Sequence, residues 1–406
     1  MRILLLSDNY PPESNAGALR SAAHAQVWAA RGHDVTVVTC FPNFPEGKLF
    51  AGYRQRPYSK TVINGVTVIR VPTLIFPNAG TFKRIIDFIS FMMAATLAGW
   101  LVRRPDVVIA TSPQFFAAAA GWMVAAVRRR PFVFELRDLW PDSVVAVGAL
   151  ANSRLLGPIR ALEHFLYRRA TAIVCVTNAF RAHLVEHGID PAKVSVVRNG
   201  ADITKFSGGD GSAIRAAHGL EGKTIVSYIG TIGMAHGLGL LLDAAEKLRA
   251  KSPDIVFLIL GTGAERDQLR DQAAKRGLSN IVFVDRVSHE EVINYWRASD
   301  MTLVMLRDSP LFRTVIPSKI FEAMATGTPI VTNVKGEIEE LLRPLQTAVF
   351  VEPGNADALA ETIAGLSANE ELRVRISAAG VRHAPLFDRT AQATLMLEEL
   401  ERIVEG

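Results

Sequence analysis

The chain has 406 residues, 49% of them hydrophobic and 21% charged, which is typical of a globular protein and excludes a disordered one. This length exceeds what one hydrophobic core usually organises, so we expect two domains. The net charge of +5 conceals an asymmetry, because residues 1–200 sum to +11 and residues 201–406 to −6. A basic half suggests a domain that faces an anionic partner, and no nucleic-acid motif accompanies it.

The first half alternates buried strands with helices. A strand is expected over 2–7, a helix over 17–30 and a second strand from His33. Residues 61–71 predict a hairpin that turns at Asn64-Gly65. Further helices are expected over 82–102 and 114–127, with strands at 107–110, 132–136, 173–176 and 194–197.

The second half repeats the pattern after residues 202–222, which we interpret as a linker. Strands are expected at 225–229, 255–260, 281–284, 301–305 and near 330 and 350, with a helix after each of the first four strands and helices at 356–366, 370–380 and 388–403. This alternation predicts an α/β protein with two doubly wound parallel sheets facing a cleft. We expect domains at 1–202 and 203–387, with the last helix (388–406) packing back onto the first domain.

Residues 317–331 predict a helix that carries a single acid among apolar neighbours. Pro317 and Ser318 suit its start, with Ser318 as a possible cap, and Gly327 suits its end. Glu322 in its second turn, near a helix N-terminus that favours anions, suits a ligand with vicinal hydroxyls beside a phosphate. An ordinary surface glutamate is the alternative.

Two loops in the first half follow predicted strands at the sheet edge where ligands bind in this class of fold. The first loop, 8–16, precedes a helix with Gly17 near its start, so backbone amides can approach a phosphate, although the three-glycine dinucleotide pattern is missing. The second loop begins at Arg137-Asp138. The alternative for Asp138 is a residue that caps the next helix.

Taken together, these motifs resemble the retaining family-4 glycosyltransferases of the GT-B fold. The resemblance rests on Tyr10-Pro-Pro-Glu with Gly17 and Arg20, Arg31-Gly-His-Asp, Arg137-Asp-Leu-Trp-Pro, Asn199-Gly-Ala-Asp, Gly230 to Gly237, Gly261-Thr-Gly and Pro317-Ser-Lys-Ile-Phe-Glu. The motifs cover nearly the whole chain in the expected order. They are most similar to the branch that builds bacterial surface polysaccharides, which includes the N-acetyl-L-fucosamine transferase of O-antigen synthesis.

The resemblance implies that the C-terminal domain binds a nucleoside-diphosphate sugar and the N-terminal domain the acceptor. It implies that Glu322 binds the ribose hydroxyls, that the Gly17 backbone lies at the diphosphate and that Asp138 lies beside the sugar. We therefore predict catalytic roles for Asp138 and Glu322. We predict donor binding by Gly17, Arg20, Gly230, Gly233, His236, Gly261, Gly263, Val287, Arg313, Ser318, Lys319 and Glu322, and acceptor binding by Asp8, Tyr10, Glu13, Asn15 and Arg137.

The chain departs from the family pattern at three positions. The paired glutamate eight residues before Glu322 is replaced by Thr314, and the diphosphate-binding Arg and Lys fall near Thr231 and His236. We infer that the diphosphate charge is met by the Gly17 and Gly233 amides, a helix N-terminus, and Lys319 or Arg313. A surface lysine is the alternative reading of Lys319, and a solvent-facing histidine that of His236.

The predicted reaction moves a sugar, N-acetylated or deoxy, from a UDP-sugar with retention to a glycan hydroxyl. No Asp-x-Asp pattern occurs, so we expect no metal and no cofactor. The alternatives are a UDP-N-acetylglucosamine 2-epimerase of the same architecture and a catalytically silent nucleotide-sugar-binding subunit.

The basic clusters bracket apolar helices, which favours a membrane surface over a duplex groove, although solvated helix ends are the alternative. No signal peptide is apparent, and the apolar window 85–102 is too interrupted to favour a membrane span. The two cysteines predict buried thiols in a reducing compartment. We expect a cytoplasmic protein on the inner face of the membrane, with a polyprenyl-diphosphate-linked glycan as acceptor.

Overall fold

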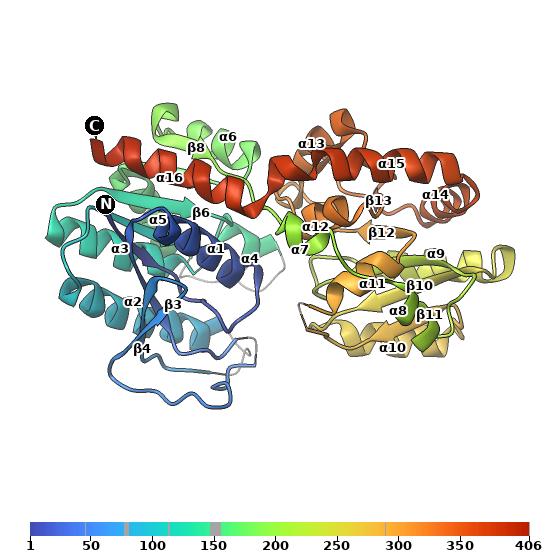
Figure 1. Cartoon of the computed structure of the whole chain (residues 1–406), viewed down its shortest axis with the longest axis horizontal. Helices are drawn as coiled ribbons and strands as arrows, with labels where there is room; N and C mark the ends of the chain where they lie inside the picture. The colour runs from blue at the N-terminus through green and yellow to red at the C-terminus, as the bar shows by residue number, and fades with distance from the viewer. Residues whose placement is uncertain (45, 77–80, 113, 147–155, 289, 406) are drawn as a thin grey trace. The chain divides into compact units, whose positions relative to one another are not determined.

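A computed structural model of the chain describes residues 1–44, 46–76, 81–112, 114–146, 156–288 and 290–405. The chain divides into two compact units (Figure 1). Unit 1 combines Met1–Asn199 with Arg389–Gly406, and unit 2 is Gly200–Asp388. The first boundary lies three residues before the predicted one.

Unit 1 is built on an eight-stranded sheet with the order β3-β4-β2-β1-β5-β6-β7-β8. Its strands are β1 (Arg2–Leu6), β2 (Asp34–Cys40), β3 (Ser59–Ile63), β4 (Val66–Val71), β5 (Val107–Thr111), β6 (Phe132–Leu136), β7 (Ala172–Cys175) and β8 (Val194–Val196). All neighbours pair in parallel except β3 with β4. The hairpin between them turns at Asn64-Gly65, both with positive φ, as the sequence predicts.

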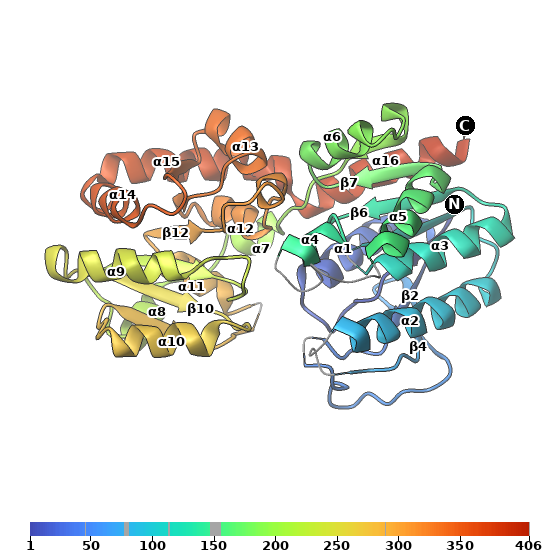
Figure 2. The same cartoon turned by 180° about the vertical axis from the view of Figure 1, so that it is seen from behind.

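Helices cover both faces of this sheet (Figures 1 and 2). They are α1 (Ala16–Ala30), α2 (Thr81–Leu101), α3 (Phe115–Arg128), α4 (Asp142–Ala146), α5 (Leu156–Arg169), α6 (Asn178–Glu186), the 3-10 turn η1 (Pro191–Lys193) and α16 (Arg389–Glu405). Helix α16 lies along α1, where the Trp28 Nε1–H donates to the Ala393 carbonyl (2.9 Å). The last helix of the chain therefore completes the core of the first unit.

Unit 2 has a six-stranded parallel sheet with the order β11-β10-β9-β12-β13-β14. The strands are β9 (Thr224–Ile229), β10 (Ile255–Leu260), β11 (Ile281–Val284), β12 (Met301–Val304), β13 (Ile330–Thr332) and β14 (Ala348–Phe350). Its helices are α7 (Ile203–Phe206), α8 (Ser212–Ala217), α9 (Gly239–Lys251), α10 (Arg266–Lys275), α11 (Val292–Ala298), η2 (Phe312–Thr314), α12 (Lys319–Thr326), α13 (Glu337–Leu345), α14 (Ala356–Ala368), α15 (Glu370–His383) and η3 (Ala384–Phe387).

The predicted α/β class with two doubly wound sheets is confirmed, and strands β6, β10 and β11 have the predicted bounds. The linker prediction for 202–222 was wrong, because this segment holds α7 and α8 inside unit 2. The Asp202 side chain accepts from the Lys205 amide and caps α7, and Arg215 on α8 pairs with Asp300 (2.8 Å). Within the described residues, no helix combines the length and apolarity that a membrane crossing needs.

Candidate functional site

In unit 2, the loops after β9 and β10 pack closely against each other at the carboxyl ends of these strands. The Gly230 amide donates to the Leu260 carbonyl and the Ile232 amide to the Thr262 carbonyl, each at 2.9 Å. Gly261 has φ +144°, and a Cβ there would overlap the Gly230 carbonyl oxygen, so only glycine permits this approach. The predicted residues Gly230, Gly261 and Gly263 thus lie on two loops that pack closely against each other.

The Gly233 amide lies on the same loop and donates to no protein acceptor in the described structure. Thr231 is exposed beside it. An unpaired backbone amide on a loop at a strand end is available to an anionic ligand.

Lys319, the first residue of α12, points its ammonium under this loop. Its Nζ is buried without a hydrogen-bond partner and lies 3.8 Å from the centroid of the Tyr228 ring. A Cβ on Gly230 would lie 3.0 Å from this Nζ. Burial lowers the pKa of Lys319 to about 7, although Glu322 opposes the shift. The surface-lysine alternative is therefore wrong, and the loop covers a cation that is held mainly by an aromatic ring.

The His236 ring meets the Tyr228 ring in an edge arrangement, at a ring-centroid distance of 6.0 Å. Its Nδ1 lies 3.3 Å from the Met305 carbonyl, which fixes Nδ1 as the donor and leaves Nε2 as an acceptor in the neutral ring. Burial and Lys319 lower the pKa of His236 to about 4. The ring is therefore neutral near pH 7, and the solvent-facing alternative is wrong because His236 is half-buried.

Helix α12 buries one face and presents Glu322, half-buried, in its first turn. Gly327 ends the helix, as predicted, and has the left-handed conformation. The predicted Ser318 cap was wrong, because the Ser318 side chain makes no capping hydrogen bond. Arg313 forms an exposed bidentate pair with Asp308, and Val287 is half-buried in the segment after β11.

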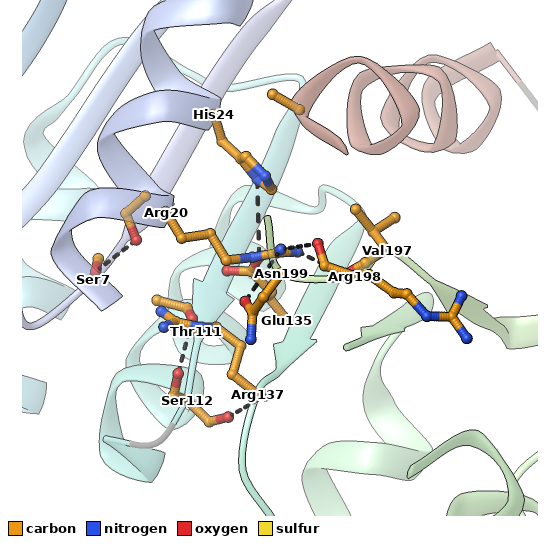
Figure 3. A network of polar contacts seen from close by, with 12 residues as sticks. Ser7, Arg20, His24, Thr111, Ser112, Glu135, Arg137, Val197, Arg198 and Asn199 are labelled. Carbon is orange, nitrogen blue, oxygen red and sulfur yellow. Dashed lines mark hydrogen bonds and ion pairs between the residues drawn. The ribbon is translucent and has the colours of Figure 1, made fainter. Parts of the chain in front are cut away.

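In unit 1, a buried ion pair joins α1 to the end of β6 (Figure 3). The Arg20 Nε donates to Glu135 Oε1 at 2.8 Å, and its other nitrogens donate to the carbonyls of Val197 and Arg198 after β8. Burial would raise the pKa of Glu135, but Arg20, His24 and Arg137 lower it to about 2. The Arg20 guanidinium is buried and is bonded within unit 1, and donor binding by Arg20 stays a prediction.

Arg137 follows Glu135 by two residues and lies beside the first turn of α1. A Cβ on Gly17 would lie 3.2 Å from Arg137 Nη1 and 3.0 Å from Asn15 Oδ1. In the described structure the Arg137 guanidinium makes no hydrogen bond, while its backbone amide donates to Ser112 Oγ (Figure 3). Burial lowers its pKa to about 10, so it stays charged. Asn15 caps α1 by accepting from the Ala18 amide, so this turn presents amides and a cation together.

Besides Asn15, three predicted acceptor residues lie in the loop after β1 and differ in exposure. Tyr10 is fully buried, and the Glu13 carboxylate is buried and accepts from the amides of Asn43, Phe44 and Tyr10. Both side chains organise the loop in the described structure, and acceptor binding by Tyr10 and Glu13 stays a prediction. Asp8 is half-buried, and its Oδ2 accepts from the Asn9 amide group.

Asp138 is half-buried at the end of β6, where Ser143 Oγ donates to its Oδ2 at 2.9 Å. Burial raises its pKa, against the opposing effects of Ser143, the Leu139 amide and Arg137. Among the described residues, no group of three His, Cys, Asp or Glu side chains has the geometry of a metal site. Metal independence stays a prediction.

Models of known protein families match both units of the chain. A family model described as "Glycosyl transferase 4-like domain" matches residues 17–200, and one described as "Glycosyl transferases group 1" matches residues 210–383. Each unit carries a glycosyltransferase domain, and the chain is a glycosyltransferase.

Relatives of this glycosyltransferase span nearly its full length. It is 26% identical over 372 residues to the putative colanic acid biosynthesis glycosyl transferase WcaI of Escherichia coli K12, covering 88% of this chain and 90% of that protein. It is 27% identical over 387 residues to the glycogen synthase of Mycobacterium tuberculosis H37Rv, with coverages of 89% and 85%. The crystal structure of Anabaena HepE in complex with UDP-glucose has a TM-score of 0.74 at 18% identity, covering 99% of this chain and 100% of that chain.

Sequence reasoning missed two residues that shape the sites of this glycosyltransferase. Tyr228 supports Lys319 from β9, and Glu135 binds Arg20 across 115 positions of sequence. Tyr228 occupies an apolar run that predicts only a buried strand. Glu135 is the single acid in the predicted strand 132–136, and a charge inside a buried strand is a usable signal for a paired partner.

Proposed function

We propose that this glycosyltransferase moves a hexose from a UDP-sugar to a hydroxyl of a glycan carried on a polyprenyl diphosphate lipid. The observation that carries the proposal is Lys319, whose buried and unpaired ammonium lies under the Gly230–Gly237 loop. A buried cation without an acceptor is costly, and an anionic ligand on the loop would compensate it.

The loop and Lys319 suit a diphosphate in particular. Lys319 supplies the charge that Thr231 and His236 lack, and the free Gly233 amide supplies a directed donor. Two anionic groups need several donors in one place, and amide dipoles combined with a buried cation provide them. Glu322, three residues after Lys319 on the same helix, is proposed to accept from the ribose hydroxyls.

In the reaction, the bond between the anomeric carbon and the diphosphate oxygen breaks, and UDP leaves with its electron pair. A bond forms from the acceptor hydroxyl oxygen to the same face of that carbon, and the hydroxyl proton is released. Lys319 and the Gly233 amide would stabilise the charge on the departing diphosphate. Asp138 is proposed to stabilise the positive charge that develops on the sugar.

The relatives support the substrate classes of this proposal. WcaI is described as a putative colanic acid biosynthesis enzyme, and HepE was crystallised with UDP-glucose. We propose a place in surface-polysaccharide synthesis at the inner face of the membrane. We propose that the donor sugar is N-acetyl-L-fucosamine, as in the O-antigen branch, or another N-acetylated or deoxy hexose. We also propose that the reaction retains the anomeric configuration and needs no metal ion.

The decisive experiment measures UDP release from a panel of UDP-sugars, with and without a lipid-linked saccharide acceptor, in EDTA. Release that depends on the acceptor, from one donor, is expected, and NMR of the new glycosidic bond would establish retention. A sugar interconverted without acceptor would instead identify the epimerase. Donor binding without turnover across the panel would identify the silent subunit.

Substitution of the two proposed catalytic carboxylates tests their roles. Asp138→Ala and Glu322→Ala should each lower turnover by at least about 10²-fold, with circular dichroism spectra unchanged. Asp254→Ala is the matched control, because this exposed carboxylate pairs with Lys223 just before β10, at the opposite end of the strand from the glycine loops. Near-wild-type turnover in either folded variant would remove that residue from the proposed mechanism.

A further inference from the structure

Helix α2 in unit 1 exposes a continuous apolar face. Its inner face packs on α3 and the sheet, and the two helices approach so closely that a Cβ on Gly99 would lie 2.6 Å from Val124 Cγ2. Its outer face carries five large apolar side chains that are 36–80% exposed, and we call these the α2 stripe: Ile89, Met93, Leu97, Trp100 and Leu101. The spacing of three and four residues places them on one side of the helix.

The polar residues around the α2 stripe are basic. Lys83 is exposed in the first turn of α2, and Arg103 and Arg104 are exposed just after its end. Arg129, at the adjoining end of α3, is exposed as well. The only acid of α2 is Asp87, which is half-buried. The stripe is therefore flanked by positive charge at both ends, and α2 itself carries no exposed acid.

Backbone carbonyls at the C-terminal end of α2 are hydrogen-bonded within the protein, which suits an environment with little water. The Arg128 guanidinium donates to the carbonyls of Trp100 and Val102, so the last turn keeps partners without water. Trp100, exposed in this same turn, has the amphipathic ring that favours the boundary between lipid headgroups and acyl chains.

We propose that the α2 stripe with its basic flanks docks this protein on the surface of an anionic lipid bilayer. The helix would lie in the plane of the interface, with Met93 and Leu97 among the acyl chains and the arginines at the phosphates. Charge selects this occupant over a second copy of the chain, because a symmetric pairing of two stripes would bring basic ends against basic ends. The proposal does not depend on the identity of the donor or acceptor.

The test uses co-sedimentation of the full chain with vesicles of phosphatidylcholine alone and with added phosphatidylglycerol. Binding is expected only with the anionic lipid, and it should weaken as salt rises. Arg103→Gln with Arg104→Gln should weaken it about thirtyfold, because each basic residue near an anionic surface contributes about fivefold. Met93→Gln with Leu97→Gln should weaken it too. The control is Val374→Gln with Val381→Gln, which changes exposed apolar residues of unit 2.

A second measurement identifies directly the protein surface that contacts the lipid. Phosphatidylglycerol vesicles with brominated acyl chains should quench the fluorescence of Trp100, and Trp100→Phe should remove that quenching. Trp28, Trp140 and Trp296 are buried, so the brominated lipid should quench their fluorescence little. Absent binding to anionic vesicles, or binding that the α2 variants leave unchanged, would overturn the proposal. So would a dimer in gel filtration that Met93→Gln with Leu97→Gln converts to a monomer.

Discussion

Arg20 and Glu135 form a buried ion pair, with Nε 2.8 Å from Oε1, that joins α1 to the end of β6 in unit 1. Both side chains are at most 5% exposed, and the same guanidinium holds the carbonyls of Val197 and Arg198. Arg20 thus connects α1, β6 and the segment after β8 at the edge of the sheet where the proposed acceptor loops begin.

Removing one partner of this pair should destabilise the protein strongly. Arg20→Met leaves the Glu135 charge buried without compensation, so the free energy of unfolding should fall by about 3–5 kcal/mol. Urea titration followed by tryptophan fluorescence measures it. Arg20→Met with Glu135→Gln should recover part of the loss, and Arg402→Ala, which breaks an exposed pair on α16, should change stability by less than about 1 kcal/mol. Equal losses in the single and double variants would contradict this account.

Lys319 should determine affinity for the diphosphate and not for the nucleoside. Lys319→Met should weaken UDP and UDP-sugar binding by about 10–100-fold, the range for one hydrogen bond to a charged group, and leave uridine binding unchanged. Isothermal titration calorimetry measures both ligands. Lys251→Met is the control, because it removes an exposed lysine at the end of α9. Equal weakening of uridine and UDP would show that the substitution damages the whole site.

Donor affinity should fall as pH rises above 7. The Lys319 pKa of about 7 means that the empty site loses its charge above this pH, while a bound diphosphate would raise the pKa and require proton uptake. The groups facing Lys319 do not reverse this sign, because His236 is already neutral, Tyr228 has a raised pKa and Glu322 is an acid. The dissociation constant of the UDP-sugar should rise by up to about tenfold per pH unit between pH 7 and 8.5.

The matching control is the pH profile of Lys319→Met, which should be flat over that range. Calorimetry at pH 8 in buffers of different ionisation enthalpy should detect proton uptake in the wild-type protein only. A flat wild-type profile would mean that Lys319 keeps its charge in the empty site.

A methyl group at Gly17 should disturb the turn beside Arg137. A Cβ there would lie 3.0 Å from Asn15 Oδ1 and 3.2 Å from Arg137 Nη1, so Gly17→Ala should shift these two side chains slightly. We expect turnover to fall by about 10–100-fold, the scale for small displacements at a reacting site, with thermal unfolding nearly unchanged. Gly365→Ala on α14 is the control, because nothing lies within 4 Å of its added Cβ, and full activity in Gly17→Ala would argue against a role for this turn.

The sequence predicted the two sheets well because their buried strands are continuous apolar runs bounded by turns. It missed α13, because Gly336 directly precedes the helix and Pro344 lies inside it. It described 202–222 as a linker because short, polar helices such as α7 give too little periodicity to recognise. The pairs Arg20–Glu135 and Lys319–Tyr228 join residues far apart in sequence, and only the folded sheets bring them together.

The position of α16 also constrains how the protein is made. Met396, Leu397 and Leu400 belong to the core of unit 1, and Trp28 finds its acceptor at Ala393. A ribosome therefore synthesises all of unit 2 before it supplies the helix that completes unit 1. Until α16 emerges, the face of α1 that it covers exposes apolar surface, so the nascent first unit is the stage at which we expect chaperone capture.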